Sequence, residues 1–300
     1  MSAAIAPGSR IAVIGLGIMG SPMAVNLARA GFAVSGYSRS GTKAGPLEAA
    51  GGTAAGSVSE AVAGADAVLT MLPDSPDVES VLGGDDGLVA TLPAGTLIVD
   101  CSTIRPDVSS RLASEASARG IELLDAPVSG GESGAVDGTL SIMVGGSAEA
   151  FERARPIFDA VGTTIVHVGP SGSGQTVKAA NQLIVAGTIE LVAESIVFLE
   201  AQGVELDAAL EVLGGGLAGS TVLARKGAAM VARDFKPGFR AALHDKDLRI
   251  LESAASTSNV VLPLGAVVTQ LMAAVKARGD GDLDHSALLT IVEALSGRDG

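Results

Sequence analysis

The feature that most constrains the fold is a regular alternation of short β-branched runs with helical patterns over the first 168 residues. Apolar runs that are bounded by Gly, Pro or Asp are typical of buried parallel strands. This alternation indicates βαβ units and a doubly wound, mostly parallel sheet. We predict strands at 10–15, 32–37, 67–72, 96–100, 121–125, 140–146 and 164–168, separated by helices at about 21–30, 58–64, 75–82, 106–119 and 147–160.

The alternation stops at a turn-rich segment, GPSGSG (169–174), and only helical patterns follow it. The first of them is apolar almost all round, so we expect it to be buried on several sides. We therefore predict an α/β protein with an N-terminal Rossmann-type domain over 1–170 and an all-helical C-terminal domain over 171–300. The predicted helices are at about 175–203, 205–214, 219–232, 241–257, 262–278 and 285–297.

Composition excludes several classes of protein. A chain of 300 residues that is 47% hydrophobic is not disordered, and a net charge of −13 argues against nucleic acid or an anionic membrane as a partner. Cys101 has no possible disulfide partner in the chain, and three histidines far apart in sequence give no reason to expect a metal site. We expect a cytoplasmic protein, because no signal peptide is visible and the longest apolar stretch contains two glutamates.

A glycine-rich motif lies between the first predicted strand and the first predicted helix. Gly15, Gly17 and Gly20 have the GxGxxG spacing, with Ile18 and Met19 between the last two. In a dinucleotide-binding turn these glycines permit the tight turn, the approach of a pyrophosphate and close packing of helix on strand. The phosphates then lie at the helix N-terminus. The alternative is a glycine-rich turn without function, but the position in the chain favours a dinucleotide site.

The residues after the second predicted strand indicate which dinucleotide binds. An NAD site usually has Asp or Glu here, to bind the ribose 2′-hydroxyl. This chain has Ser38, Arg39 and Ser40 instead, and its first 47 residues contain four basic side chains but no acid. A guanidinium can bind a 2′-phosphate. We predict NADP(H) in preference to NAD(H); the alternative is that Arg39 is a solvated loop residue.

Five segments together resemble the β-hydroxyacid dehydrogenase family: GLGIMGSPMAVNLARAG, MLPDSPDV, DAPVSGGESGAVDGTLSIMVGG, GSGQTVKAANQ and FKPGFRAALHDKDL. The resemblance extends from about Arg10 to Ser296 and implies the fold of 6-phosphogluconate dehydrogenase. GGGLAGSTVL (214–223), FKPGFR and DHSAL (284–288) are most similar to the branch that reduces tartronate semialdehyde.

The resemblance implies roles for particular residues. Lys178 would be the catalytic lysine, and Asn181, three residues further along the predicted helix, would hold the substrate hydroxyl. An ammonium group near a carbonyl oxygen stabilises the developing alkoxide and can donate the proton. Without the resemblance, an exposed helical lysine is the simpler interpretation of Lys178.

Further residues carry over from the family pattern. Ser129, Gly130 and Gly131 would hold a substrate carboxylate, although Ser-Gly-Gly is also an ordinary turn. Phe239 would cover the substrate. The implied cofactor contacts are Leu72, Pro73, Thr103 and Lys246. The alternative for Lys246 is an ion pair with Asp245 or Asp247. We interpret Cys101 as a structural thiol, and place His244 and His285 on the surface or behind the site.

The sequence thus predicts an NADPH-dependent reductase of a small aldehyde acid, with tartronate semialdehyde converted to D-glycerate as the first candidate. Another short-chain β-hydroxyacid dehydrogenase, such as one acting on 3-hydroxyisobutyrate, is the alternative in the same class. A non-catalytic dinucleotide-binding module is the alternative in a different class. The apolar helical half indicates a homodimer or homotetramer.

Overall fold

A computed structural model describes residues 4–41 and 44–298, so Lys43 of the basic opening segment lies outside the described residues. The chain divides into two compact units, Met1–Lys178 and Ala179–Gly300. The division falls inside one long helix, α9 (Ser173–Ala201). The boundary that we predict between residues 170 and 171 lies at the turn before this helix.

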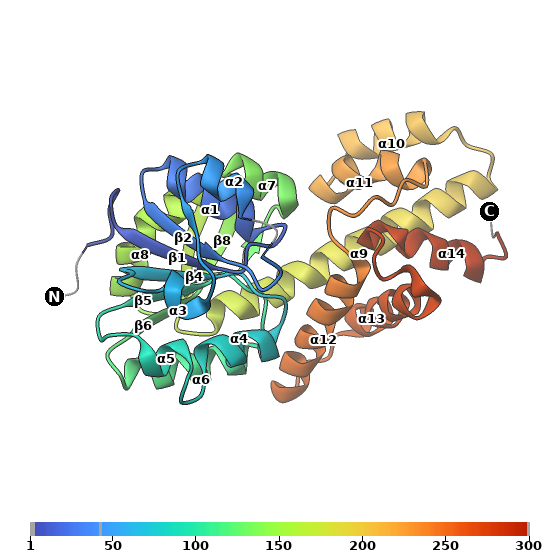
Figure 1. The fold of residues 1–300 in the computed structure, drawn as a ribbon. Helices are drawn as coiled ribbons and strands as arrows, with labels where there is room; N and C mark the ends of the chain where they lie inside the picture. Colours follow the sequence, from blue (N-terminus) through green and yellow to red (C-terminus); the bar gives the residue numbers. More distant parts are fainter. Residues whose placement is uncertain (1–3, 42–43, 299–300) are drawn as a thin grey trace. The chain divides into compact units, whose positions relative to one another are not determined.

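Nine strands form one sheet within the described part of unit 1 (Figure 1). The order is β3-β2-β1-β4-β5-β6-β8-β7, with β9 also paired to β8, and the pairs from β3 to β6 are all parallel. The order reverses at β1 and β4, which makes their carboxyl ends the topological switch point. The strands are β1 (Arg10–Ile14), β2 (Ala33–Tyr37), β3 (Thr53–Ala54), β4 (Ala67–Thr70), β5 (Leu97–Asp100), β6 (Glu122–Asp125), β7 (Val128–Ser129), β8 (Leu140–Gly145) and β9 (Gly162–Gly169).

Hydrophobic cores cover both faces of the sheet because side chains alternate along each strand. In β1, Ile11 and Val13 belong to one core, and Ala12 and Ile14 to the other. The first core is closed by α1 (Gly20–Arg29), α2 (Gly45–Ala49), α7 (Gly131–Asp137) and α8 (Ala148–Val161). The second is closed by α3 (Val58–Ala61), α4 (Ser75–Leu82), α5 (Leu88–Thr91) and α6 (Pro106–Ser117) (Figure 1).

The predicted Rossmann-type sheet is confirmed, and all seven predicted strands are present to within a few residues. The sequence patterns missed β3, β7, α2, α5 and α7. The two strands have only two residues each, too few for alternation to show, and the three helices have four to seven residues, about two turns at most. The junction of β6 with β8 and the β7–β8 pair are antiparallel, so the sheet is mostly but not wholly parallel.

All the regular elements in the described residues of unit 2 are helices, apart from an isolated antiparallel bridge between Arg240 and Asp284. Its core contains Ala186, Ile189 and Ala193 of α9, packed with apolar residues from the later helices. The last two predicted helices differ from the prediction at one end each. The helix predicted at 262–278 ends in a π turn (Lys276–Asp280) that contains Gly279 at φ 94°, and the helix predicted at 285–297 begins with a 3₁₀ turn (His285–Leu288) before α14. The other helices are α10 (Leu206–Gly215), α11 (Thr221–Val231), α12 (Ala241–Thr257), α13 (Pro263–Val275) and α14 (Leu289–Leu295).

Helix α9 is long and apolar enough to cross a membrane by length and composition alone. Of its most apolar 18-residue window, 44% is buried inside the protein. The sequence predicts that this helix is buried on several sides, because it is apolar almost all round. Four large apolar side chains on the same helix are nevertheless exposed: Val177, Ile184, Leu191 and Phe198.

Candidate active site

The glycine motif forms the turn between β1 and α1 at the switch point of the sheet. Gly15 has φ 108°, and a Cβ there would lie 2.3 Å from the carbonyl oxygen of Met71. A Cβ on Gly20 would lie 1.9 Å from the carbonyl oxygen of Gly15. By contrast, a Cβ on Gly17 would meet nothing within 4 Å. Gly15 and Gly20 are therefore required by the turn itself, whereas Gly17 leaves open space of the kind that an approaching phosphate needs.

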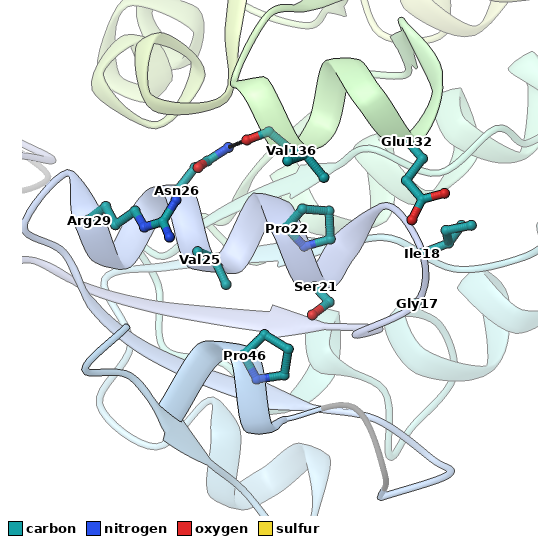
Figure 2. Close-up of a pocket in the computed structure, with 10 residues that line it drawn as sticks. All are labelled: Gly17, Ile18, Ser21, Pro22, Val25, Asn26, Arg29, Pro46, Glu132 and Val136. Carbon is teal, nitrogen blue, oxygen red and sulfur yellow. Dashed lines mark hydrogen bonds between the residues drawn. The ribbon is translucent and has the colours of Figure 1, made fainter. Parts of the chain in front are cut away.

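A groove of mixed polarity begins at this turn and follows the outer side of α1 (Figure 2). Gly17, Ile18 and Glu132 lie together at one end of it, and Arg29 lies at the other. Half of the Ile18 side chain is exposed, while Met19 is partly buried against the core. Gly17 and Ile18 thus border solvent, as we expect of residues beside a bound dinucleotide.

Ser38, Arg39 and Ser40 follow the end of β2, where the sequence places them. The two serine hydroxyls lie 3.2 Å apart, and the Arg39 side chain is 87% exposed. Its guanidinium lies 3.7 Å from the carboxylate of Asp77, at the start of α4. The absence of acids from residues 1–47 therefore does not keep carboxylates away from Arg39. The sequence alone missed this pair because Asp77 comes from a distant segment.

The start of α9 is fixed to the carboxyl edge of the sheet by two buried side chains. The carboxylate of Asp125, at the end of β6, accepts hydrogen bonds from the backbone N–H groups of Gly172 (2.8 Å) and Gln175 (3.0 Å). The Gln175 side chain accepts from Ile104 N–H (3.0 Å) and donates to the Ser102 carbonyl (2.8 Å). A negative charge at a helix N-terminus is favourable. Burial nevertheless raises the pKa of the Asp125 carboxyl, against the lowering effect of these N–H groups.

Lys178 follows one turn after this anchor. Its side chain is buried, and Nζ donates a hydrogen bond to the carbonyl of Val128 at 2.9 Å. The next residue, Ser129, ends β7, and Gly130 and Gly131 have φ of 141° and 67°. The interpretation of Lys178 as an exposed lysine is therefore wrong. Gly131 begins helix α7 rather than lying in a plain loop, so the Ser-Gly-Gly segment is a strand-to-helix junction.

The residues that the family pattern assigns to the cofactor follow the ends of β4 and β5. Leu72 and Pro73 come after β4, and Thr103 comes after β5. The Leu72 N–H donates to the hydroxyl of Ser102 at 2.9 Å, which joins the two loops. These positions share one edge of the sheet with the Gly15–Gly20 turn, because the strands are parallel.

A buried carboxyl lies beneath these loops. Asp100 accepts hydrogen bonds from the Thr70 hydroxyl (2.7 Å) and the Ser102 N–H (3.1 Å), and its Oδ2 has no hydrogen-bond partner. Burial raises the pKa of this carboxyl to about 6. Burial also raises the pKa of the neighbouring Cys101 thiol, which therefore stays protonated and inert, as we expect of a structural thiol.

In unit 2, hydrogen bonds centre on Gln182 of α9. Asn181 donates to its side-chain oxygen (2.8 Å), and its amide nitrogen donates to Asp247 (2.6 Å). Lys246 forms an ion pair with the same Asp247 at 2.9 Å. This ion pair is the alternative that the sequence offers for Lys246, whereas Gln182 at the centre of the cluster was not predicted. The sequence does contain a signal for a buried polar cluster: the adjacent charged residues of the HDKD segment are unusual on the buried face of a helix.

Phe239 precedes α12 and is half-buried. Its ring lies edge-on to both His244 and His285, with centroids 5.7 and 5.5 Å away. Both histidines are buried, so a surface position for either is wrong. Among the described residues, no group of three or more His, Cys, Asp or Glu side chains could hold a metal ion.

The two glycines at the ends of the motif provide a matched test. We expect Gly17→Ala to fold normally but to bind a dinucleotide more weakly by about 1–3 kcal/mol, because its Cβ fills space that a phosphate would occupy. Gly20→Ala should instead lower the free energy of unfolding by about 2 kcal/mol or more, because its Cβ collides with Gly15. Urea unfolding and NADPH fluorescence titration measure the two effects. If both variants changed the free energy of unfolding and the dinucleotide affinity by the same amounts, this division of roles would be wrong.

The buried carboxyl of Asp100 makes stability depend on pH. Its folded pKa of about 6 lies above the ordinary value of 3.8, so the folded state holds the proton more tightly. Stability is then lost as pH rises from about 4 to 6, and the loss persists above 6. We expect Asp100→Asn to gain about 3 kcal/mol relative to wild type between pH 4 and 7. Urea unfolding at several pH values measures this gain; a constant difference would refute it.

Comparison with known proteins agrees with the fold and with the glycine turn. Residues 10–169 match the family model of the NAD-binding domain of 6-phosphogluconate dehydrogenase. Residues 172–292 match a second family model, described as NAD-binding of NADP-dependent 3-hydroxyisobutyrate dehydrogenase.

Individual relatives cover nearly the whole chain. The 2-hydroxy-3-oxopropionate reductase of Escherichia coli is 42% identical over 96% of this chain and 98% of its own length. The NAD-dependent L-serine dehydrogenase of Pseudomonas aeruginosa is 40% identical over 96% and 99%. A solved structure of Mycobacterium tuberculosis 3-hydroxyisobutyrate dehydrogenase with L-serine has a TM-score of 0.85 at 36% identity, covering 94% and 98%. The chain therefore belongs to the β-hydroxyacid dehydrogenase family and is an NAD(P)-dependent oxidoreductase.

Proposed function

We propose that this protein is an NADPH-dependent reductase of a small aldehyde acid, with tartronate semialdehyde reduced to D-glycerate as the preferred reaction. The observation that carries the proposal is the placement of Lys178. A buried ammonium group is fixed at the Val128 carbonyl, one residue before the Ser129-Gly130-Gly131 junction. The residue proposed as the proton donor therefore lies next to the segment proposed to bind the substrate carboxylate, within one unit.

The residues of the chain supply everything except the hydride, which comes from the nicotinamide cofactor. Lys178 would hold the carbonyl oxygen of the substrate, stabilise the alkoxide that develops on it and donate the proton. Ser129 and the N–H groups of Gly130 and Gly131 would bind the substrate carboxylate. Asn181 would hold the substrate hydroxyl and Phe239 would cover it. Gly15–Gly20, Leu72, Pro73, Thr103 and Lys246 would hold the cofactor.

Two relatives support different substrates. The Escherichia coli protein is named for 2-hydroxy-3-oxopropionate, whereas the Pseudomonas aeruginosa protein is named for L-serine. Tartronate semialdehyde and L-serine both carry a polar group where 3-hydroxyisobutyrate carries a methyl. A site that pairs this group rejects the methyl analogue strongly. Oxidation of 3-hydroxyisobutyrate is the second candidate, supported by relatives such as the Pseudomonas aeruginosa 3-hydroxyisobutyrate dehydrogenase, 36% identical over 93% of this chain.

Assays with Lys178→Ala test the proposal directly. The variant should lower kcat by about 10²–10⁴, the usual contribution of a general acid, while NADPH binding stays close to wild type. Lys236→Ala removes an exposed lysine and is the matched control, with unchanged turnover expected. Both are measured with a panel of semialdehydes, hydroxyacids and L-serine.

The panel also separates the candidate functions. Preference for tartronate semialdehyde supports the proposal, and preference for 3-hydroxyisobutyrate favours the second candidate. Near-normal turnover by Lys178→Ala would remove its catalytic role. Binding of NADPH without turnover of any compound by the wild type would favour a non-catalytic dinucleotide-binding module.

The proposed preference for NADPH depends on Arg39, whose guanidinium faces Asp77. Arg39→Ala should raise KM for NADPH about tenfold, because a charge-assisted hydrogen bond to the 2′-phosphate is lost, and should leave KM for NADH nearly unchanged. Asp77→Asn should lower KM for NADPH a few-fold, since exposed ion pairs contribute about 0.2–1 kcal/mol. Steady-state kinetics with both coenzymes measure these effects. A wild type that uses NADH as well as NADPH would contradict the proposed preference.

We also propose a homodimer or homotetramer in the cytoplasm. Ile184, Leu191 and Phe198 recur every seventh residue on α9 and are all exposed, which forms one apolar stripe on the helix. Leu264 of α13 is also exposed and lies close to Gly187 of α9, so the apolar surface extends onto α13. A second copy of this chain would cover such a surface.

Light scattering after size-exclusion chromatography tests this assembly. The wild type should be a dimer or tetramer, and Leu191→Glu should shift it towards the monomer because a charge cannot be buried unpaired at the interface. Leu217→Glu, which adds the same charge at an exposed apolar side chain outside α9 and α13, is the matched control and should leave the assembly unchanged. A monomeric wild type would contradict the proposal.

A further inference from the structure

Two buried histidines of unit 2 form a direct contact that the proposed mechanism does not use. His244 lies on α12 and is fully buried, and His285 begins the 3₁₀ turn before α14. Their Nδ1 atoms are 2.9 Å apart, which is hydrogen-bond distance. One imidazole must therefore donate to the other.

The surroundings determine where the proton lies. His244 Nε2 is 3.1 Å from the backbone carbonyl of Gln182, and a carbonyl can only accept. His244 Nε2 therefore carries a hydrogen, and in the neutral ring its Nδ1 is an acceptor. His285 Nδ1 must then be the donor. The neutral pair consequently holds its protons in opposite tautomers, Nε2–H on His244 and Nδ1–H on His285.

A buried carboxylate fixes His285 and the loop before α12. Asp284 accepts hydrogen bonds from Lys226 Nζ (2.8 and 2.7 Å) and from the N–H groups of Gly238 (2.9 Å) and Phe239 (3.1 Å). His285 Nε2 lies 3.8 Å from the same carboxylate. Burial would raise the pKa of Asp284, but the charge that His285 carries when it is protonated and the hydrogen bonds from Lys226, Ser286 and the Phe239 N–H lower it well below its usual range. Asp284 therefore stays ionised and holds the Phe239 loop.

The histidine pair touches Phe239 and is linked through Gln182 to Asn181, the two unit 2 residues that the proposed function assigns to the substrate. The ring of Phe239 packs edge-on against both imidazoles. His244 binds the carbonyl of Gln182, and Asn181 donates to the Gln182 side chain. Loss of the contact between the rings would free Phe239 and the α9 turn that carries Asn181 together.

We propose that the His244–His285 pair is a positioning element, which holds Phe239 and the Asn181 turn in place for the hydroxyacid substrate. This inference rests on the proposed function. Neither histidine is a catalytic residue, because both act through other side chains. Their effect is expected on substrate affinity, while the binding of NADPH and the role of Lys178 stay unchanged.

Histidine ¹⁵N NMR of the wild-type protein at pH 8 tests the geometry without any substitution. The two ring nitrogens of neutral histidine have different shifts depending on which one is protonated. We expect one buried histidine in the Nε2–H form and another in the Nδ1–H form, assigned by the loss of each signal in a His→Phe variant. The same tautomer on both rings, or shifts averaged between tautomers, would overturn the inference.

Kinetics of His285→Phe test the consequence. Phenylalanine keeps a planar ring but removes the Nδ1 donor, which leaves His244 Nδ1 without that partner. We expect KM for the preferred substrate to rise about tenfold, the usual effect of one lost buried hydrogen-bond partner, with smaller changes in kcat and in the Kd of NADPH. His167→Phe, whose ring lies against Phe151 in unit 1, is the matched control and should leave KM unchanged.

The outcomes separate this inference from the proposed function. An active wild type whose KM is unaffected by His285→Phe overturns the positioning role and leaves the proposed function intact. An inactive wild type overturns the proposed function and, with it, the positioning role for a substrate. If His285→Phe does not fold, the milder His285→Gln, which keeps a donor, must retain KM within a few-fold of wild type, and a tenfold rise would overturn the inference.

Discussion

The candidate site depends on one interaction: the carboxylate of Asp125 accepts hydrogen bonds from backbone N–H groups at the start of α9. The first N–H groups of a helix have no partner inside the helix, and here two of them find one at the end of β6. Gly174 makes this close approach possible, because a Cβ there would lie 2.3 Å from the Met143 carbonyl oxygen. The position of Lys178 follows from it, since helical geometry fixes a residue one turn after Gln175.

A second set of interactions in unit 2 has the same logic. Asp247, Asp284 and the two buried histidines are polar groups inside an apolar core, and each has specific hydrogen-bond or ion-pair partners. Buried polar groups without partners would cost about 1–3 kcal/mol each, so such a network tolerates few alternative arrangements. Phe239 packs against the two histidines of this network, and Asn181 donates a hydrogen bond to Gln182, which belongs to it. The network therefore determines how firmly these two residues, which are assigned to the substrate, are held in place.

Most of the fold could be predicted from local patterns. The β-branched runs at 10–15 and 96–100 became β1 and β5, and the predicted helix at 241–257 is α12. The two-residue strand β7 and the seven-residue helix α7 escaped prediction, because two residues show no alternation and two helical turns show little periodicity. The helix α7 changes the chemistry of the Ser129–Gly131 segment, since Gly131 is the first residue of a helix rather than part of a loop.

The sequence by itself determined the fold class, the glycine turn and the family, because these depend on spacing along the chain. Only the tertiary structure decided which side chains face each other. Asp77 lies 30 residues beyond the acid-free segment 1–47, yet its carboxylate is 3.7 Å from the guanidinium of Arg39. The contact between His244 and His285 joins positions 41 residues apart. Electrostatic and hydrogen-bond partners are set by distance in space, which sequence spacing does not give.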